Sequence, residues 1–151
     1  MILREPKVLL VDDEQEYLDD FLSLFSEKFQ LLTACGGEAA LRLLENEAIG
    51  VVVSDQRMPK MSGTELLAEI SRRYPQTVRI LYTGYSDIHA IIDAINKGEV
   101  YRYLSKDAPL KEVEIVIRQA IEQFKLQETN RRLLQEVRKL QEELESLAEV
   151  R

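Results

Sequence analysis

The fold is constrained most by five short apolar segments that alternate with stretches whose apolar residues recur at helical spacing. These apolar segments are residues 7–11, 30–34, 51–53, 78–82 and 100–104. Unbroken apolar runs predict strands buried on both faces, whereas the period-two pattern of the last segment predicts a half-exposed edge strand. Strands that alternate with helices are typical of a parallel sheet with helices on both faces, joined by right-handed crossovers. We therefore predict an α/β fold with three layers around five strands.

Several residues predict where helices begin and end. Ser62-x-x-Glu65 is a capping-box pattern and predicts a helix that starts at this point. Gly50 is typical of the cap that follows the carboxyl end of the preceding helix. Pro109 suits the first turn of the last helix, with Asp107 as a candidate cap.

Composition limits the class of protein. The chain has 151 residues, 45% of them hydrophobic, which suits one ordinary domain plus a short extension. Its net charge of −7 argues against binding to nucleic acid or to an anionic membrane surface. The single cysteine, Cys35, excludes an internal disulfide and a cysteine metal cluster, and we interpret it as a small apolar filler. No signal peptide or membrane span is expected, because apolar runs fall short of about 20 residues. We therefore expect a cytoplasmic protein.

Reactive side chains stand where four of the five predicted strands end, at Asp12, Asp13, Asp55, Thr83 and Lys106. In a parallel sheet these ends share one edge, so the side chains would meet. Three carboxylates lie close together only if a cation neutralises them or their pKa values rise, and hard oxygen ligands favour Mg2+. Lys106 adds a positive charge for an anion, and Thr83 adds a hydroxyl donor. Such a set can move a phosphoryl group onto a carboxylate.

Each of these residues also has a simpler interpretation when it is taken alone. Asp55 can merely end a strand, and Asp12-Asp13 can be an acidic pair at a helix amino terminus. Thr83 can belong to a plain turn, and Lys106 can face solvent. Their joint occurrence, each at the end of its strand, favours a shared site.

The chain resembles the receiver domain of bacterial two-component response regulators over about residues 5 to 124. The matching residues are Asp12, Asp13, Asp55, Met58, Pro59, Gly63, Thr83, Gly84, Tyr103 and Lys106. The resemblance implies a flavodoxin-like, doubly wound five-stranded parallel sheet with strand order 2-1-3-4-5. We expect a receiver domain at residues 1–124 and a coiled-coil linker helix at residues 125–151.

The resemblance implies a phosphorylation-dependent switch that catalyses only its own phosphorylation and dephosphorylation and is otherwise not an enzyme. Asp55 would accept the phosphoryl group from a histidine kinase or a small acyl phosphate. Asp12, Asp13 and Asp55, with the backbone carbonyl of Arg57, would hold Mg2+. Arg57 also occupies a position that tunes the lifetime of the phosphoryl group in this family.

Further positions carry implied roles or depart from the family pattern. Lys106 would pair with the phosphoryl oxygens, Thr83 would turn its hydroxyl to the phosphoryl group, and Tyr103 would swing inward. Asp107 stands where the family usually has proline, which leaves the shape of the loop open. Tyr85 occupies the second position that tunes phosphoryl lifetime.

The carboxyl-terminal segment predicts a long helix with a heptad repeat, because no helix breaker follows Pro109. Its seam residues are Leu126, Asn130, Leu133, Val137, Leu140, Leu144 and Leu147. Leucine at every d position and a single asparagine at a favour a parallel, in-register, two-stranded coil. An unbroken helix to Arg151 would be roughly 65 Å long, too long for one domain to cover. We expect a homodimer whose coil links the receiver to an output domain outside this chain; the alternative is a monomeric, charge-rich helix.

Two other function classes are weighed against the switch. A receiver-like scaffold could dimerise through the coil without a working acceptor, and Asp107 and Arg57 leave room for this. A phosphohydrolase with Asp55 as nucleophile is disfavoured, because Arg57 stands where a second carboxylate would act as general acid. A nucleotide-binding fold is also disfavoured, since neither Gly-x-Gly-x-x-Gly nor a lysine-bearing phosphate loop is present.

Overall fold

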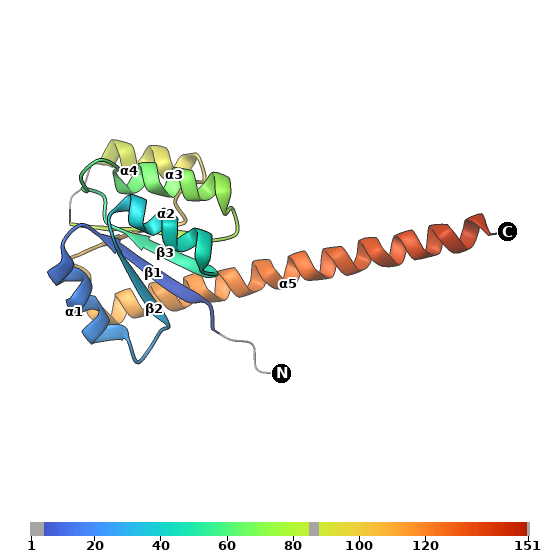
Figure 1. Cartoon of the computed structure of the whole chain (residues 1–151), viewed down its shortest axis with the longest axis horizontal. Coiled ribbons are helices and arrows are strands. Elements are labelled where there is room, and N and C mark those ends of the chain that lie inside the picture. Colours follow the sequence, from blue (N-terminus) through green and yellow to red (C-terminus); the bar gives the residue numbers. More distant parts are fainter. Residues whose placement is uncertain (1–4, 85–87, 151) are drawn as a thin grey trace.

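A five-stranded parallel sheet lies between two layers of helices in the computed structural model, which describes residues 5–84 and 88–150 (Figure 1). The elements in chain order are β1 (Lys7–Asp12), α1 (Gln15–Phe25), β2 (Leu31–Cys35), α2 (Gly37–Asn46), β3 (Ile49–Ser54), α3 (Gly63–Arg73), β4 (Val78–Thr83), α4 (Ile88–Asn96), β5 (Arg102–Ser105) and α5 (Leu110–Glu149). The strand order is β2-β1-β3-β4-β5, and all neighbouring strands pair in parallel. The predicted α/β class and the strand order implied by the resemblance are both confirmed.

The strands send alternate side chains into two separate cores. In β1, Val8 and Leu10 lie in the core shared with α1 and α5. Leu9 and Val11 point the other way, into the core shared with α2, α3 and α4. All four side chains are at most 1% exposed. Burial on both faces is the physical reason for the unbroken apolar runs in the sequence.

Helix α5 runs without interruption from the sheet into a segment that projects beyond the other elements (Figure 1). Val113, Ile117 and Ile121 are buried against the sheet, and Phe124 contacts the same core. Leu126 is 57% exposed, and Glu128 still lines a cavity of the domain; between Glu128 and Val150 every residue except Arg131 is exposed. The helix has 40 residues and is therefore about 60 Å long. None of the helices in the described residues combines the length and apolarity that crossing a membrane requires.

Two expected helix caps are wrong. Gly50 lies inside β3, because α2 already ends at Asn46. A Cβ at Gly50 would come within 2.6 Å of Pro6 and 3.0 Å of the Phe124 ring, so this position serves close packing where α5 crosses the strand. The residue that precedes α5 is Pro109 itself, which leaves Asp107 outside the cap position.

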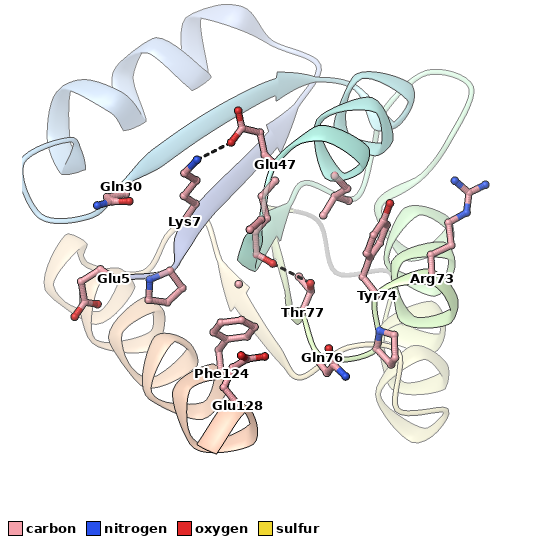
Figure 2. A pocket seen from close by; sticks show the side chains of 16 residues that line it. Glu5, Lys7, Gln30, Glu47, Arg73, Tyr74, Gln76, Thr77, Phe124 and Glu128 are labelled. Atoms are coloured by element: carbon pink, nitrogen blue, oxygen red, sulfur yellow. Dashed lines mark hydrogen bonds and ion pairs between the residues drawn. The ribbon is translucent and has the colours of Figure 1, made fainter. Parts of the chain in front are cut away.

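A cavity of about 810 Å³ lies at the amino-terminal edge of the sheet (Figure 2). Beside it, the Lys7 ammonium pairs with Glu47 at 2.6 Å, and the Thr77 hydroxyl donates to the Ile49 carbonyl at 3.0 Å. Phe124 of α5 also lines it. The lining described for this cavity contains none of the residues predicted for phosphoryl chemistry, which lie at the other edge of the sheet.

Candidate functional site

The carboxyl-terminal edge of the sheet gathers acids from two neighbouring strands. Asp12 is the last residue of β1 and Asp13 follows it, while Asp55 directly follows β3. The two strands pair, and the Asp55 N–H donates to the Val11 carbonyl at 2.9 Å. One carboxylate oxygen of each acid lies within 4.8 Å of one oxygen of each of the others. The three acids therefore form one cluster, as the strand ends predict.

Lys106 follows β5 and brings a positive charge to this cluster. Its ammonium nitrogen lies 2.9 Å from Asp12 Oδ2 and 3.5 Å from Asp55 Oδ1. Asp12 Oδ1 accepts a hydrogen bond from the Glu14 N–H at 3.0 Å. Lys106 is only 21% exposed, so its attraction to the acids is weakly screened by solvent.

Strands β4 and β5 add two hydroxyl groups. Thr83 is the last residue of β4 and is fully buried, and its side chain hydrogen-bonds Asp55. Tyr103 of β5 is half-buried, and its hydroxyl donates to the Thr83 carbonyl at 3.4 Å. The Tyr103 ring thus already lies against the strand that carries Thr83.

The charges of the cluster shift its pKa values. Burial raises the pKa of Asp55, and Asp12 adds to this, although Lys106, the Thr83 hydroxyl and a backbone hydrogen bond act in the opposite direction. Burial also lowers the pKa of Lys106, but its hydrogen bond to Asp12 and the charges of both acids raise it overall. The ammonium therefore stays protonated, while Asp55 is ionised at a cost that a further cation would reduce.

The loop between β3 and α3 is packed tightly against the end of β3. Ser62 Oγ accepts the Glu65 N–H at 3.2 Å, which confirms that Ser62 caps the start of α3, and the Ser62 hydroxyl lies 3.1 Å from Glu65 Oε1, to which it donates. The Gly63 N–H donates to the Gln56 carbonyl at 2.9 Å. A Cβ on Gly63 would lie 2.1 Å from the Asp55 carbonyl oxygen, so glycine alone permits this approach.

The positions that depart from the family pattern leave the cluster intact. Asp107 is exposed, and its N–H donates to Ser105 Oγ at 3.2 Å. No peptide bond within 5–84 and 88–150 is cis, yet Lys106 still reaches both acids. Arg57 is exposed two residues beyond Asp55, and Tyr85 lies outside the described residues.

Two residues beside the site differ from expectation. Cys35 is exposed rather than an apolar filler, because it ends the edge strand β2, and its thiol donates to the Asp13 carbonyl at 3.4 Å. Tyr17 was not predicted, although its ring centroid lies 4.0 Å from the Lys106 ammonium. An aromatic residue one turn after an acidic pair was the available signal, but nothing in the sequence connects it to Lys106.

Comparison with known families shows to which family the chain belongs. The family described as response regulator receiver domain matches residues 8–118. The chain belongs to this family. A receiver is a regulatory signalling module of two-component systems and not a classical enzyme.

Similar proteins agree with this assignment. The hydrogenase transcriptional regulatory protein HoxA of Cupriavidus necator is 36% identical over 135 residues, which cover 89% of this receiver chain and 28% of HoxA. The response regulator FleR of Pseudomonas aeruginosa is 36% identical over 122 residues, or 78% of the chain and 25% of FleR. The signal receiver domain of an HD domain-containing protein from Pseudomonas fluorescens superposes with a TM-score of 0.76 at 41% identity, covering 80% of this chain and 98% of that one. The chain spans about a quarter of the length of the curated relatives it matches.

Response regulators receive phosphate from histidine kinases, and receiver domains generally bind Mg2+ at an acidic pocket. The donor set of this receiver suits such an ion. Asp12, Asp13 and Asp55 offer hard carboxylate oxygens within 4.8 Å of one another, and their negative charge exceeds that of the single Lys106 cation.

Proposed function

We propose that this receiver is a phosphorylation-dependent switch in which Asp55 accepts a phosphoryl group from a histidine kinase. The observation that carries this proposal is the cluster itself, three carboxylates within 4.8 Å with the Lys106 ammonium on two of them. An Asp55 oxygen attacks the phosphorus atom and forms the new O–P bond. The bond from phosphorus to the donor breaks, and the donor leaves with its electron pair.

The acidic residues have two tasks in this reaction. Asp12, Asp13 and Asp55, together with the backbone carbonyl of Arg57, would hold Mg2+. The bound ion supplies positive charge that offsets the charge on the transferring phosphoryl group. Because burial and Asp12 raise the pKa of Asp55, a second positive charge also favours the ionised carboxylate that attacks.

The remaining site residues respond to the phosphoryl group once it is attached. Lys106 donates to a phosphoryl oxygen from its place beside Asp55, and the Thr83 hydroxyl exchanges its bond to Asp55 for another phosphoryl oxygen. The Tyr103 hydroxyl donates to the Thr83 carbonyl at 3.4 Å, so a movement of Thr83 would change this hydrogen bond to β5. The added phosphoryl charge would thus shift the equilibrium between two packing arrangements of Thr83 and Tyr103.

Intact-protein mass spectrometry tests the acceptor. The chain is incubated with acetyl phosphate, with Mg2+ or with EDTA, as wild type, Asp55→Asn and the matched control Asp93→Asn, whose carboxylate is exposed on α4. We expect a single phosphoryl adduct on wild type and Asp93→Asn that requires Mg2+, and no adduct on Asp55→Asn. An adduct on Asp55→Asn would contradict the assignment. Loss of both the adduct and Mg2+ binding in wild type would favour the scaffold.

We further propose that residues 1–124 form the receiver, that residues 125–151 form a homodimeric coiled coil, and that the protein acts in the cytoplasm, where histidine kinases transfer phosphate. Seam residues are exposed in the single chain: Leu126 57%, Leu133 53%, Val137 49%, Leu140 57%, Leu144 67% and Leu147 68%, with Asn130 also exposed. An apolar row of this kind, interrupted by the polar Asn130, favours a partner helix. Phosphorylation would change the packing of α4, β5 and α5 and so pass to the coil.

Disulfide crosslinking tests the coupling between site and coil. Leu140→Cys is placed in a Cys35→Ala background, which is necessary because Cys35 is exposed. We expect the crosslinking rate to change when acetyl phosphate and Mg2+ are added, and to stay constant when Asp55→Asn is also present. Equal rates with and without acetyl phosphate, in protein shown by mass to be phosphorylated, would contradict coupling.

A further inference from the structure

Tyr17 holds an aromatic face against the Lys106 ammonium. The ammonium nitrogen lies over the ring, 4.0 Å from its centroid. Tyr17 stands in the first turn of α1, where its partly buried ring packs against the core beneath the sheet. The ring of Tyr82, buried on β4, lies 6.1 Å away at a tilt of 55° and supports it. The ring is therefore fixed by packing before Lys106 contacts it.

The other contacts of Lys106 are with carboxylates that have a second task. Its ammonium lies 2.9 Å from Asp12 and 3.5 Å from Asp55, the same two residues that would hold Mg2+. Two cations that share these oxygens compete for them. The Tyr17 face is a contact that uses no carboxylate oxygen, and cation–π attraction is strongest where solvent is excluded. The Lys106 side chain is 21% exposed, so most of it is shielded from solvent.

The backbone alone leaves the ammonium poorly located. The loop fixes the main chain of Lys106, whose N–H donates to the Thr83 carbonyl at 3.2 Å. The next residue is Asp107, which anchors its own N–H on Ser105 Oγ at 3.2 Å and points its side chain to solvent. Several freely rotating bonds still separate the Lys106 backbone from its charge, and ordering them has an entropic cost. A preformed ring at the end of that side chain reduces the number of positions available to the charge.

We infer that Tyr17 is a positioning residue that holds the Lys106 ammonium beside Asp55 for phosphoryl transfer. The inference rests on the proposed function, because it acts through Lys106 on the acceptor Asp55. The Tyr17 hydroxyl is hydrogen-bonded to the side chain of Tyr82, so the face of the ring is the part of Tyr17 that meets the Lys106 ammonium. The aromatic face is the feature that matters, so a phenylalanine serves and an aliphatic residue of similar size does not.

The test compares Tyr17→Leu with the matched control Tyr17→Phe. The phosphorylation rate of Asp55 with acetyl phosphate is expected to fall about threefold to thirtyfold in Tyr17→Leu, from the usual strength of a cation–π contact, and to stay within about twofold of wild type in Tyr17→Phe. A second readout needs neither metal nor phosphodonor. The NMR signals of the Lys106 ε-protons should be shifted upfield by the ring in wild type and Tyr17→Phe, and should return to ordinary values in Tyr17→Leu.

A double-mutant cycle separates positioning from a general structural effect. In a Lys106→Met background, Tyr17→Leu should lower the rate no further, whereas damage to the fold would lower it again. An unshifted Lys106 signal in wild type, or equal phosphorylation rates for Tyr17→Leu and wild type, would overturn the inference. If Tyr17→Leu does not fold, Tyr17→Met takes its place. An absent adduct on wild type would instead overturn the proposed function and this inference with it.

Discussion

Truncation of one seam leucine gives the most quantitative test of the coil. Leu140 is 57% exposed in the single chain, and a partner helix would cover that surface. Full burial of a leucine side chain is worth about 1.5–3 kcal/mol, so covering the exposed part is worth about 1–1.7 kcal/mol per chain. A two-stranded coil contains the residue twice. We therefore expect Leu140→Ala to weaken the dimer by about 2–3 kcal/mol, which raises its Kd roughly 30- to 150-fold.

Sedimentation equilibrium over a wide range of protein concentrations measures this Kd directly. The matched control is Gln135→Ala, which truncates an exposed residue of the same helix outside the seam. The control should change the Kd by less than about threefold, because surface substitutions usually cost under about 0.5 kcal/mol. Equal effects of the two variants would refute the predicted seam. A wild-type chain that stays monomeric at every concentration would refute the coil itself.

Three further substitutions test the site and the fold around it. Burial raises the pKa of Asp55, so the ionised carboxylate makes the folded state less stable at neutral pH. We therefore expect Asp55→Asn to raise the melting temperature measured at neutral pH without Mg2+. This gain should vanish as the pH falls to about 3.9, the ordinary pKa of an aspartate. A lower melting temperature at neutral pH would contradict this. Gly63→Ala should lower the free energy of unfolding, measured with urea, by about 1–3 kcal/mol or more, because its Cβ would lie 2.1 Å from a backbone oxygen. The control is Gly84→Ala, whose Cβ would have its nearest atom at 3.9 Å. Arg79→Lys should lower the free energy of unfolding by about 2 kcal/mol in the same assay, because one ammonium cannot replace the hydrogen bonds of the guanidinium to four backbone carbonyls. An unchanged urea midpoint would show that these hydrogen bonds are dispensable.

The sheet could be predicted because strands that are buried on both faces are apolar at every position. Runs such as 51–53 are apolar at every position, and each was placed in a strand that the structure confirms. The limits of strands are set by pairing with a neighbour, which the sequence does not show. Val100 is buried, yet β5 begins only at Arg102. Gly50 was misread for a similar reason, because its close neighbours are Pro6 and Phe124, both remote in sequence.

The candidate site could be predicted as far as it depends on strand ends. Parallel strands bring their carboxyl ends to one edge, and the strand order implied by the resemblance sets β1 beside β3, so the meeting of Asp12, Asp13 and Asp55 could be predicted. Cys35 was interpreted as an apolar filler from its residue type, whereas its exposure follows from its place at the end of the edge strand β2. The contact between Tyr17 and Lys106 depends on side-chain rotamers from two separate layers, for which a single sequence carries no signal.

The continuity of α5 supports the proposal that a change at the site reaches the coil. Ile117 faces the sheet and Leu126 begins the seam, and they are separated by roughly two and a half helical turns, so they lie on opposite sides of one continuous helix. A rotation that α5 makes to keep Ile117 packed therefore turns the seam by the same angle. Seam residues tolerate little rotation, because knobs must enter the holes of the partner helix. Under the proposed function, the coil would therefore respond to a change in α5 packing through the continuity of the helix, without a separate contact between the receiver and the coil.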